Sequence, residues 1–174
     1  MVMIIPENYK CELGVLETQK AIKNLKDFFQ SELSKELSLL RVSSPLFVLP
    51  ETGTNDNLSG VETPVSFVVP FMNKKAEIVQ SLAKWKRMAI KRYNIPVYEG
   101  IYADMNAIRK DEERDNLHSL YVDQWDWEYH IKKCYNPYFL EKISTFRTNI
   151  NAGFANVGKG ANNYKFVYPD QYIY

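Results

Sequence analysis

The residues best suited to chemistry stand in one short segment, Leu117 to Glu128, which reads LHSLYVDQWDWE. If this segment is a strand, alternate side chains point to opposite faces, so Gln124 and Asp126 point the same way. An amide beside a carboxylate can hold a small polar molecule by hydrogen bonds and by charge. The same pattern also fits an antiparallel strand whose far end faces water. Alternation alone leaves both interpretations open.

The opposite face of this strand carries most of its aromatic area, which favours packing against helices. Its members are Tyr121, Asp123, Trp125, Trp127 and Tyr129.

A second set of candidate residues is basic. The spacing of apolar residues predicts a helix over Ala76–Tyr93, and its other positions are rich in lysine and arginine. Either this is a solvated basic face, or Lys86 or Arg87 turns inward to a carboxylate or a phosphate. Periodicity does not choose between them. The expected buried stripe is Ile78, Leu82, Trp85 and Ala89.

A charged connector precedes the first segment. Gly100–Arg109 has the pattern of a strand, and residues 110–116, KDEERDN, join it to the next strand in a predicted antiparallel hairpin. Arg109, at the strand end, can form two parallel hydrogen bonds to a phosphate. Glu112 could hold that arginine or contact a base. A further acid, Asp56, lies in the loop-like stretch Pro50–Gly60, where a simple turn is the alternative.

The remaining elements position these residues. An amphipathic helix of roughly twenty residues is predicted from Glu17, because apolar residues recur at spacings of three and four. The stretch Arg41–Leu49 is expected to be a strand that lies at an edge or breaks at Pro45. An edge beside a long helix would suit a dimer surface. Residues Val61–Met72 alternate with period two, and Pro64 and Pro70 limit their regular pairing. A helix is expected over Phe139–Ala155 and a strand over Tyr164–Tyr174. The apolar stripe of the first helix consists of Ile22, Leu25, Phe29, Leu33, Leu37 and Leu40.

Composition limits the possible functions. A chain of 174 residues with 45% hydrophobic residues is long enough for one domain with a real core. The net charge of +1 gives no basic face for nucleic acid. Cys11 and Cys134 lack metal-ligand spacing and are expected to be free thiols, and His118 and His130 make no ligand set with them. No run suits a signal peptide or a membrane span, so a cytoplasmic protein is expected.

Four segments together resemble the signature segments of the aspartate–ammonia ligase family, the ammonia-dependent asparagine synthetases. The resemblance runs from about Val15 to the end of the chain. The segments keep the family's order and spacing: NDNLSG at 55–60, SLAKWKR at 81–87, RKDEER at 109–114 and LHSLYVDQWDWE at 117–128.

The resemblance implies an α+β fold of the class II aminoacyl-tRNA synthetase type, an antiparallel sheet flanked by helices, in a homodimer. The long helix with Pro45 resembles motif 1, and the hairpin over 100–129 resembles motif 2, which holds ATP. Residues 1–174 would be a single catalytic domain of about half the family's usual length, with motif 3 absent and the sheet incomplete at its C-terminal end.

The reaction implied by the resemblance joins L-aspartate, ammonia and ATP into L-asparagine, with AMP and pyrophosphate released and Mg²⁺ accompanying ATP. The catalytic residues would be Arg109, on the α-phosphate, and Lys86, paired with a substrate carboxylate. Aspartate would be held by Asp56, Gln124, Asp126 and Ser81. ATP would be held by Arg109, Glu112, His118 and Ser119, and no closed metal cage is expected.

Two other functions fit the same residues. A non-catalytic module that binds an amino acid or a nucleotide, or that only dimerises, would keep motifs 1 and 2 without motif 3. A tRNA-dependent synthetase relative is less favoured, because no anticodon-binding domain precedes the motifs and the charge is near neutral.

Overall fold

The computed structural model of the chain describes residues 7–56, 58–113, 115, 118–131, 141, 142 and 144. The expected helix at 139–155 and strand at 164–174 lie outside this part, apart from residues 141, 142 and 144. None of the helices described is long and apolar enough to cross a membrane. The elements are α1 (Val15–Leu37), β1 (Leu39–Arg41), β2 (Phe47–Val48), η1 (Pro50–Thr52), β3 (Ser66–Val69), η2 (Pro70–Met72), β4 (Lys74–Ile78), α2 (Ala83–Arg92), β5 (Gly100–Ile108) and β6 (Tyr121–Tyr129).

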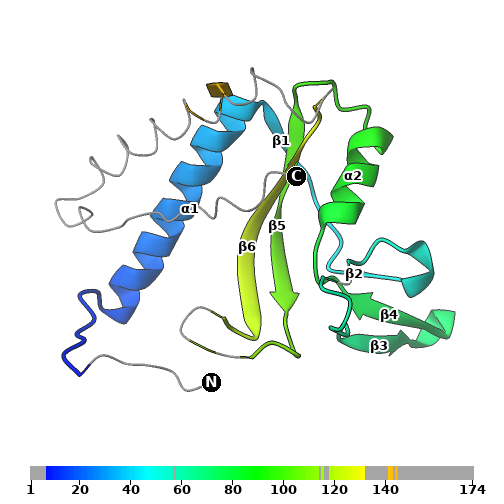
Figure 1. Ribbon diagram of the computed structural model, residues 1–174, viewed down its shortest axis with the longest axis horizontal. Coiled ribbons are helices and arrows are strands. Elements are labelled where there is room, and N and C mark those ends of the chain that lie inside the picture. The colour runs from blue at the N-terminus through cyan, green and yellow to red at the C-terminus, as the bar shows by residue number, and fades with distance from the viewer. Residues whose placement is uncertain are drawn as a thin grey trace.

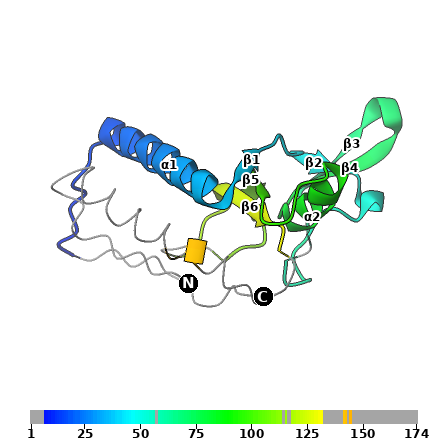
Figure 2. The ribbon, with the colours of Figure 1, turned by 90° about the horizontal axis from the view of Figure 1, so that it is seen from above.

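The main sheet has the strand order β1-β5-β6, with α1 on one side of it and α2 on the other (Figures 1 and 2). Strands β5 and β6 form the predicted antiparallel hairpin, in register from Gly100 opposite Tyr129 to Ile108 opposite Tyr121. The pairing of β1 with β5 is parallel, so the sheet is mixed rather than wholly antiparallel. A Cβ at Gly100 would lie 2.4 Å from the Glu128 carbonyl oxygen, so glycine lets the strands meet this closely.

The aromatic face of β6 packs against α1, as its alternation predicts. Leu33 and Leu37 of α1 are buried with Tyr102 of β5, and Trp125 and Trp127 pack against them. The Trp125 ring meets the Phe29 ring edge-on at 5.6 Å between centroids. This side of the sheet is therefore core, and the other face of β6 carries the apolar Val122 followed by the polar Gln124 and Asp126.

The first helix ends earlier than its apolar stripe suggests. Ser38 adopts a left-handed conformation (φ 50°, ψ 53°), and its N–H bonds to the Ser34 carbonyl, which closes the helix at Leu37. Leu40, expected on the helical stripe, lies instead in β1 and is exposed. The expectation of a helix through Leu40 is therefore wrong by three residues, because a local turn interrupts a pattern that continues in the sequence.

The expected strand over 41–49 is split between two sheets. Its start belongs to β1, and its end is β2, which joins a second sheet with the strand order β2-β4-β3. Pro45 lies between the two short strands, so the predicted break is confirmed. The alternation over 61–72 yields only β3, between Pro64 and Pro70, and a 3-10 turn begins at Pro70.

The second helix begins seven residues later than predicted. The residues from Lys74 to Ile78 form β4, in which Ala76 lies opposite Phe67 of β3, so Ile78 belongs to a strand and not to the helix stripe. Helix α2 starts at Ala83, and Leu82 and Ala89 are buried as predicted. Pairing with β3, which the helical spacing does not reveal, decides this boundary.

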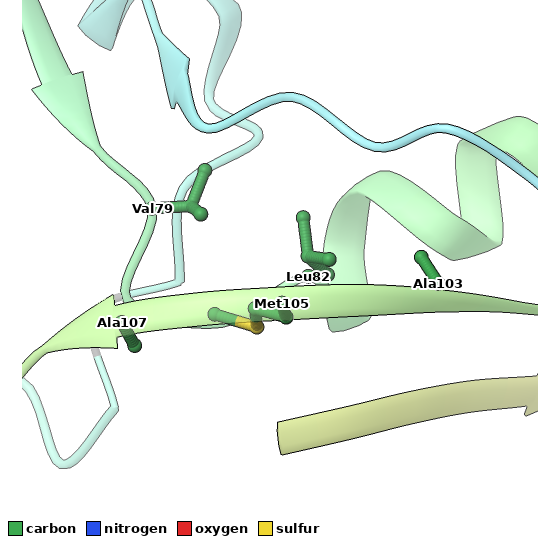
Figure 3. Close-up of a cluster of buried hydrophobic side chains, with 5 residues drawn as sticks. All are labelled: Val79, Leu82, Ala103, Met105 and Ala107. Atoms are coloured by element: carbon green, nitrogen blue, oxygen red, sulfur yellow. The ribbon is translucent and has the colours of Figure 1, made fainter. Parts of the chain in front are cut away.

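A second buried cluster lies on the α2 side of β5. Figure 3 shows its five side chains around that strand. Because Ala103, Met105 and Ala107 alternate along β5, they share one face. Val122 of β6 packs against the same cluster, which places Gln124 and Asp126 on this side of the sheet. The cluster consists of Val79, Leu82, Ala103, Met105 and Ala107.

Candidate active site

Lys86 is the basic residue of α2 that turns inward. Its side chain is only 2% exposed, and its ammonium group forms an ion pair with the Asp126 carboxylate. The same ammonium donates a hydrogen bond to the Trp127 carbonyl, at 3.0 Å. A buried ammonium needs such partners, because leaving it unpaired away from water is strongly unfavourable. Of the two residues that periodicity left open, Lys86 is therefore the one that turns inward, whereas the Arg87 side chain is 66% exposed.

Gln124 and Asp126 share a face of β6, as alternation predicts. Asp126 stands opposite Ala103, and Gln124 opposite Met105. The Gln124 amide nitrogen donates to the Met105 sulfur at 3.1 Å. A thioether is a weak acceptor, so a stronger acceptor could displace it at little cost. Gln124 and Asp126 together give this face the polar groups to hold a small charged molecule, and the small Ala103 stands beside Asp126 on the neighbouring strand.

Asp56 is held close to the start of α2. Its carboxylate lies 3.9 Å from the Lys84 ammonium, which also donates to the Asn55 carbonyl. The neighbouring Asn55 side chain is buried, accepts from the Gln80 N–H at 2.9 Å and donates to the Ile78 carbonyl at 3.2 Å. These bonds fasten the loop that carries Asp56 to the segment between β4 and α2.

Ser81 precedes α2 and is half-buried. Its hydroxyl oxygen accepts a hydrogen bond from the Ala83 N–H at 3.2 Å, which satisfies one of the donors at the start of the helix. This contact gives Ser81 a local structural role beside the expected contact with a substrate.

Positive side chains on α2 face negative side chains on β6. Arg87, one residue after Lys86, approaches Glu128 with 3.8 Å between Nε and Oε1. Burial raises the pKa of Glu128 above its ordinary value; Lys86 and Arg87 oppose that shift, while Asp126 adds to it. The two cations and two carboxylates form a cluster in which each charge has a partner of opposite sign.

The residues expected to hold ATP lie at the turn of the hairpin. The Arg109 N–H bonds to the Leu120 carbonyl at 2.7 Å, and the Arg109 carbonyl accepts from the Glu112 N–H at 3.1 Å. Glu112, His118 and Ser119 are exposed, and the Arg109 side chain is half-buried. The His118 ring nitrogen Nδ1 lies 2.8 Å from the Asp115 carboxylate. These residues belong to the connector, whereas the Lys86 cluster belongs to a helix and a strand.

A cleft of about 700 Å³ opens at the other end of β6. Arg87 and Glu128 stand at its edge, with Ile90, Pro96 and His130 further along its wall. Gln124 and Asp126 are not among the described residues that line it. We therefore centre the candidate site on the Lys86 cluster and not on this cleft.

Sequence reasoning missed three of the residues that shape this region. The composition of Pro50–Gly60 predicts only a loop, although the buried Asn55 side chain anchors it. Helical spacing places Lys84 only among the basic residues of α2, although it pairs with Asp56. The charged connector does not distinguish Asp111 from its neighbours, although it bonds to Thr63. Each contact joins residues far apart in the chain, and no local pattern indicates it.

The fold is that of the class II aminoacyl-tRNA synthetases. The structure is similar to asparaginyl-tRNA synthetase of Entamoeba histolytica, with a TM-score of 0.53 over 80% of this chain and 30% of that one. At 13% sequence identity, the likeness establishes the fold alone.

Sequence comparison defines the family within that fold. The aspartate-ammonia ligase family model matches residues 16–162, and the chain belongs to this family. An aspartate–ammonia ligase of Ruminiclostridium cellulolyticum is 52% identical over 169 residues, which are 97% of this chain and 49% of that protein. Another, of Clostridium tetani, is 62% identical over 75% of this chain and 39% of its own length. The chain thus spans about half the length of these relatives, or less.

Proposed function

We propose that this chain carries the aspartate-binding residues and ATP-binding residues of an aspartate–ammonia ligase site. The overall reaction would convert L-aspartate, ammonia and ATP into L-asparagine, AMP and pyrophosphate. The observation that carries the proposal is the buried Lys86–Asp126 pair, with Gln124 beside it on the same face of β6. Family membership supports the assignment. We further propose that the protein works as a cytoplasmic homodimer.

The chemistry requires activation of the substrate's side-chain carboxylate. A free carboxylate is a poor acyl donor, because its leaving group would be oxide. Transfer of the adenylyl group from ATP to this carboxylate gives a β-aspartyl-adenylate and releases pyrophosphate. Ammonia then attacks the carbonyl carbon, and AMP leaves with the bonding electron pair. The protein's part is to position the reactants and to stabilise charge on the phosphate oxygens.

The residues of the α2–β6 face divide the substrate between them. The Asp126 carboxylate suits the α-ammonium group of aspartate, and Lys86 suits a substrate carboxylate. Because these two are paired with each other, the zwitterionic substrate can replace each partner with an equivalent charge. Gln124 would exchange its weak bond to the Met105 sulfur for a bond to substrate oxygen. Asp56 and Ser81 would complete the pocket from the loop and from the start of α2.

The hairpin turn would hold the nucleotide. Arg109 has the donor geometry for two bonds to the α-phosphate, which a lysine cannot provide. Glu112, His118 and Ser119 would contact the remainder of ATP. Mg²⁺ would arrive with the phosphates and neutralise part of their charge. In the part of the chain that the structure describes, no three His, Cys, Asp or Glu side chains stand together as a metal site.

A non-catalytic module that binds aspartate or ATP is the second candidate. Such a module would bind its ligands without turnover. The two candidates therefore differ in one observable, the release of AMP.

The test uses two proteins. One is the 174-residue chain, and the other is this chain fused to the part of the R. cellulolyticum relative that it does not cover. Each is incubated with ATP, Mg²⁺ and L-aspartate, with and without ¹⁵N-ammonium, and AMP and asparagine are quantified by mass spectrometry. We expect the fusion to release AMP and form amide-labelled asparagine only with ammonium. A folded fusion that binds both substrates without turnover would support the module instead.

A further inference from the structure

Two loops that are far apart in the sequence are fastened together by one carboxylate. Oδ2 of Asp111 accepts a hydrogen bond from the Thr63 N–H at 2.8 Å and another from the Thr63 hydroxyl at 3.0 Å. The Lys110 ammonium donates to the same hydroxyl and lies 3.0 Å from Oδ1 of Asp111. Thr63 and Asp111 are 48 residues apart, so this contact, here called the Thr63–Asp111 clip, joins separate parts of the fold.

The Thr63 end of the clip belongs to a braced loop. Glu62 accepts hydrogen bonds from the Ser59 N–H at 3.0 Å and from its hydroxyl, which closes the turn before Thr63. Further back along the chain are Asp56 and the buried anchor Asn55. The clip therefore acts on the loop that presents Asp56 to the aspartate pocket.

The Asp111 end of the clip lies inside the hairpin turn. The Glu112 N–H bonds to the Arg109 carbonyl, so Asp111 stands within a tight turn between the two proposed ATP contacts. Arg109 is also fixed to the sheet through its N–H bond to Leu120. Holding Asp111 in place therefore restricts the backbone of the turn between Arg109 and Glu112.

We propose that Asp111 is a positioning residue, which couples the ATP-contacting turn at Arg109 to the aspartate-contacting loop at Asp56. The inference rests on the proposed function and adds that the two substrate sites depend on each other. A carboxylate that accepts two bonds from one residue gives a directional, charge-assisted link. The hydrogen bonds from Thr63, followed by that from Lys110, lower the pKa of Asp111 to about 2, so the carboxylate is ionised at neutral pH. The clip is thus complete under assay conditions.

The test compares variants of the fusion protein described above. Asp111→Ala removes the clip, Thr63→Val removes its hydroxyl bond, and Thr63→Ser restores that bond. Glu113→Ala is the matched control, because it removes the same charge from an exposed position of the same turn. The readouts are kcat for AMP release and the KM for ATP at low and at saturating L-aspartate.

We expect Asp111→Ala to lower kcat/KM by about tenfold, as misplaced reacting groups do. We expect the KM for ATP of the unsubstituted fusion to fall as L-aspartate saturates, and that of Asp111→Ala to stay unchanged. Thr63→Val should show part of this loss, and Thr63→Ser should restore the original behaviour. The double variant Asp111→Ala/Thr63→Val should lose no more activity than Asp111→Ala alone. A purely structural role would leave the response to aspartate intact.

Three results would overturn the inference. Asp111→Ala could behave like Glu113→Ala, or the effects of Asp111→Ala and Thr63→Val could be fully additive. If the unsubstituted fusion binds both substrates but releases no AMP, the proposed function fails, and the coupling fails with it. If the unsubstituted fusion releases AMP but Asp111→Ala and Glu113→Ala behave alike, the proposed coupling fails and the proposed function stands. If circular dichroism shows that Asp111→Ala is not folded, the comparison of Thr63→Val with Thr63→Ser tests the coupling instead.

Discussion

The two proposed halves of the candidate site, one for aspartate and one for the nucleotide, are built differently. On the aspartate side, Lys86 comes from a helix and Asp126 and Gln124 from the strand that faces it, and the lysine is almost fully buried. On the nucleotide side, Glu112, His118 and Ser119 are exposed and belong to the connector between two strands. One half depends on packing across the core, and the other on the shape of a turn.

This difference teaches where substitutions should be felt. Side chains on packed elements are held precisely, and their loss disturbs folding as well as binding. Side chains on exposed turns serve function with little effect on stability. Each prediction below breaks or sharpens this contrast, and the activity assays use the fusion protein.

The largest effect is expected for Lys86→Met. Removing the lysine leaves Asp126 without its ion-pair partner beside the core, which should cost about 3 kcal/mol of unfolding free energy. Urea unfolding of the 174-residue chain measures this. Lys84→Met on the same helix is the control: Lys84 is exposed, and its pair with Asp56 should be worth under about 1 kcal/mol. Equal losses in the two variants would mean that the Lys86 pair is not a structural anchor.

Arg109→Ala should affect activity without affecting stability. Loss of a donor that stabilises developing phosphate charge should lower the rate of AMP formation by about 10²–10³-fold. The urea midpoint should stay unchanged, because the side chain stands at a turn. Arg92→Ala, at the exposed end of α2, controls for the loss of a positive charge. A stability loss comparable to that of Lys86→Met would erase the contrast between the two halves.

Gln124→Ala should separate the substrates. Losing a hydrogen bond to a charged group costs about 1.5–3 kcal/mol, so the KM for L-aspartate should rise by about tenfold or more. The KM for ATP should stay within about twofold, apart from coupling between the sites. Steady-state kinetics with each substrate varied in turn gives both values. A rise in the KM for ATP alone would contradict the prediction, because Gln124 would then belong to the nucleotide half of the site.

The smallest effect is expected for Glu128→Gln, and it depends on pH. Burial raises the pKa of Glu128 in the folded state above its ordinary 4.5, so the folded state holds this proton more tightly than the unfolded state. The resulting penalty is absent below pH 4.5 and grows as pH rises through the raised pKa. Glu128→Gln should therefore be the more stable form at pH 7 and match the original at pH 4. Thermal unfolding across this range checks it, and a variant that is less stable at pH 7 contradicts the sign.

Local patterns were enough for the elements whose faces are decided by alternation or helical spacing. The hairpin of β5 and β6, the aromatic face around Trp125 and the shared direction of Gln124 and Asp126 are confirmed. The predicted helix boundaries are wrong where a turn or a tertiary contact ends or delays the helix. Ser38 closes α1 before Leu40, and pairing with β3 keeps Ala76 in a strand.

Helical periodicity could not choose between Lys86 and Arg87, and only the resemblance of residues 81–87 to the family's segment favoured Lys86. Adjacent helical residues point in directions about 100° apart, and only the docking of α2 on β6 selects Lys86 for burial. The anchor at Asn55 and the clip at Asp111 depend on partners far along the chain. Such contacts leave no periodic signal in a single sequence.

The most direct test of the account is calorimetric titration of the fusion protein with L-aspartate. Three forms are compared: unsubstituted, Gln124→Ala and Arg109→Ala. The account predicts that Gln124→Ala weakens aspartate binding by about tenfold or more, while Arg109→Ala binds L-aspartate almost as tightly as the unsubstituted form. Tight binding by Gln124→Ala together with lost binding by Arg109→Ala would contradict it, because aspartate would then be held at the hairpin turn and not between α2 and β6.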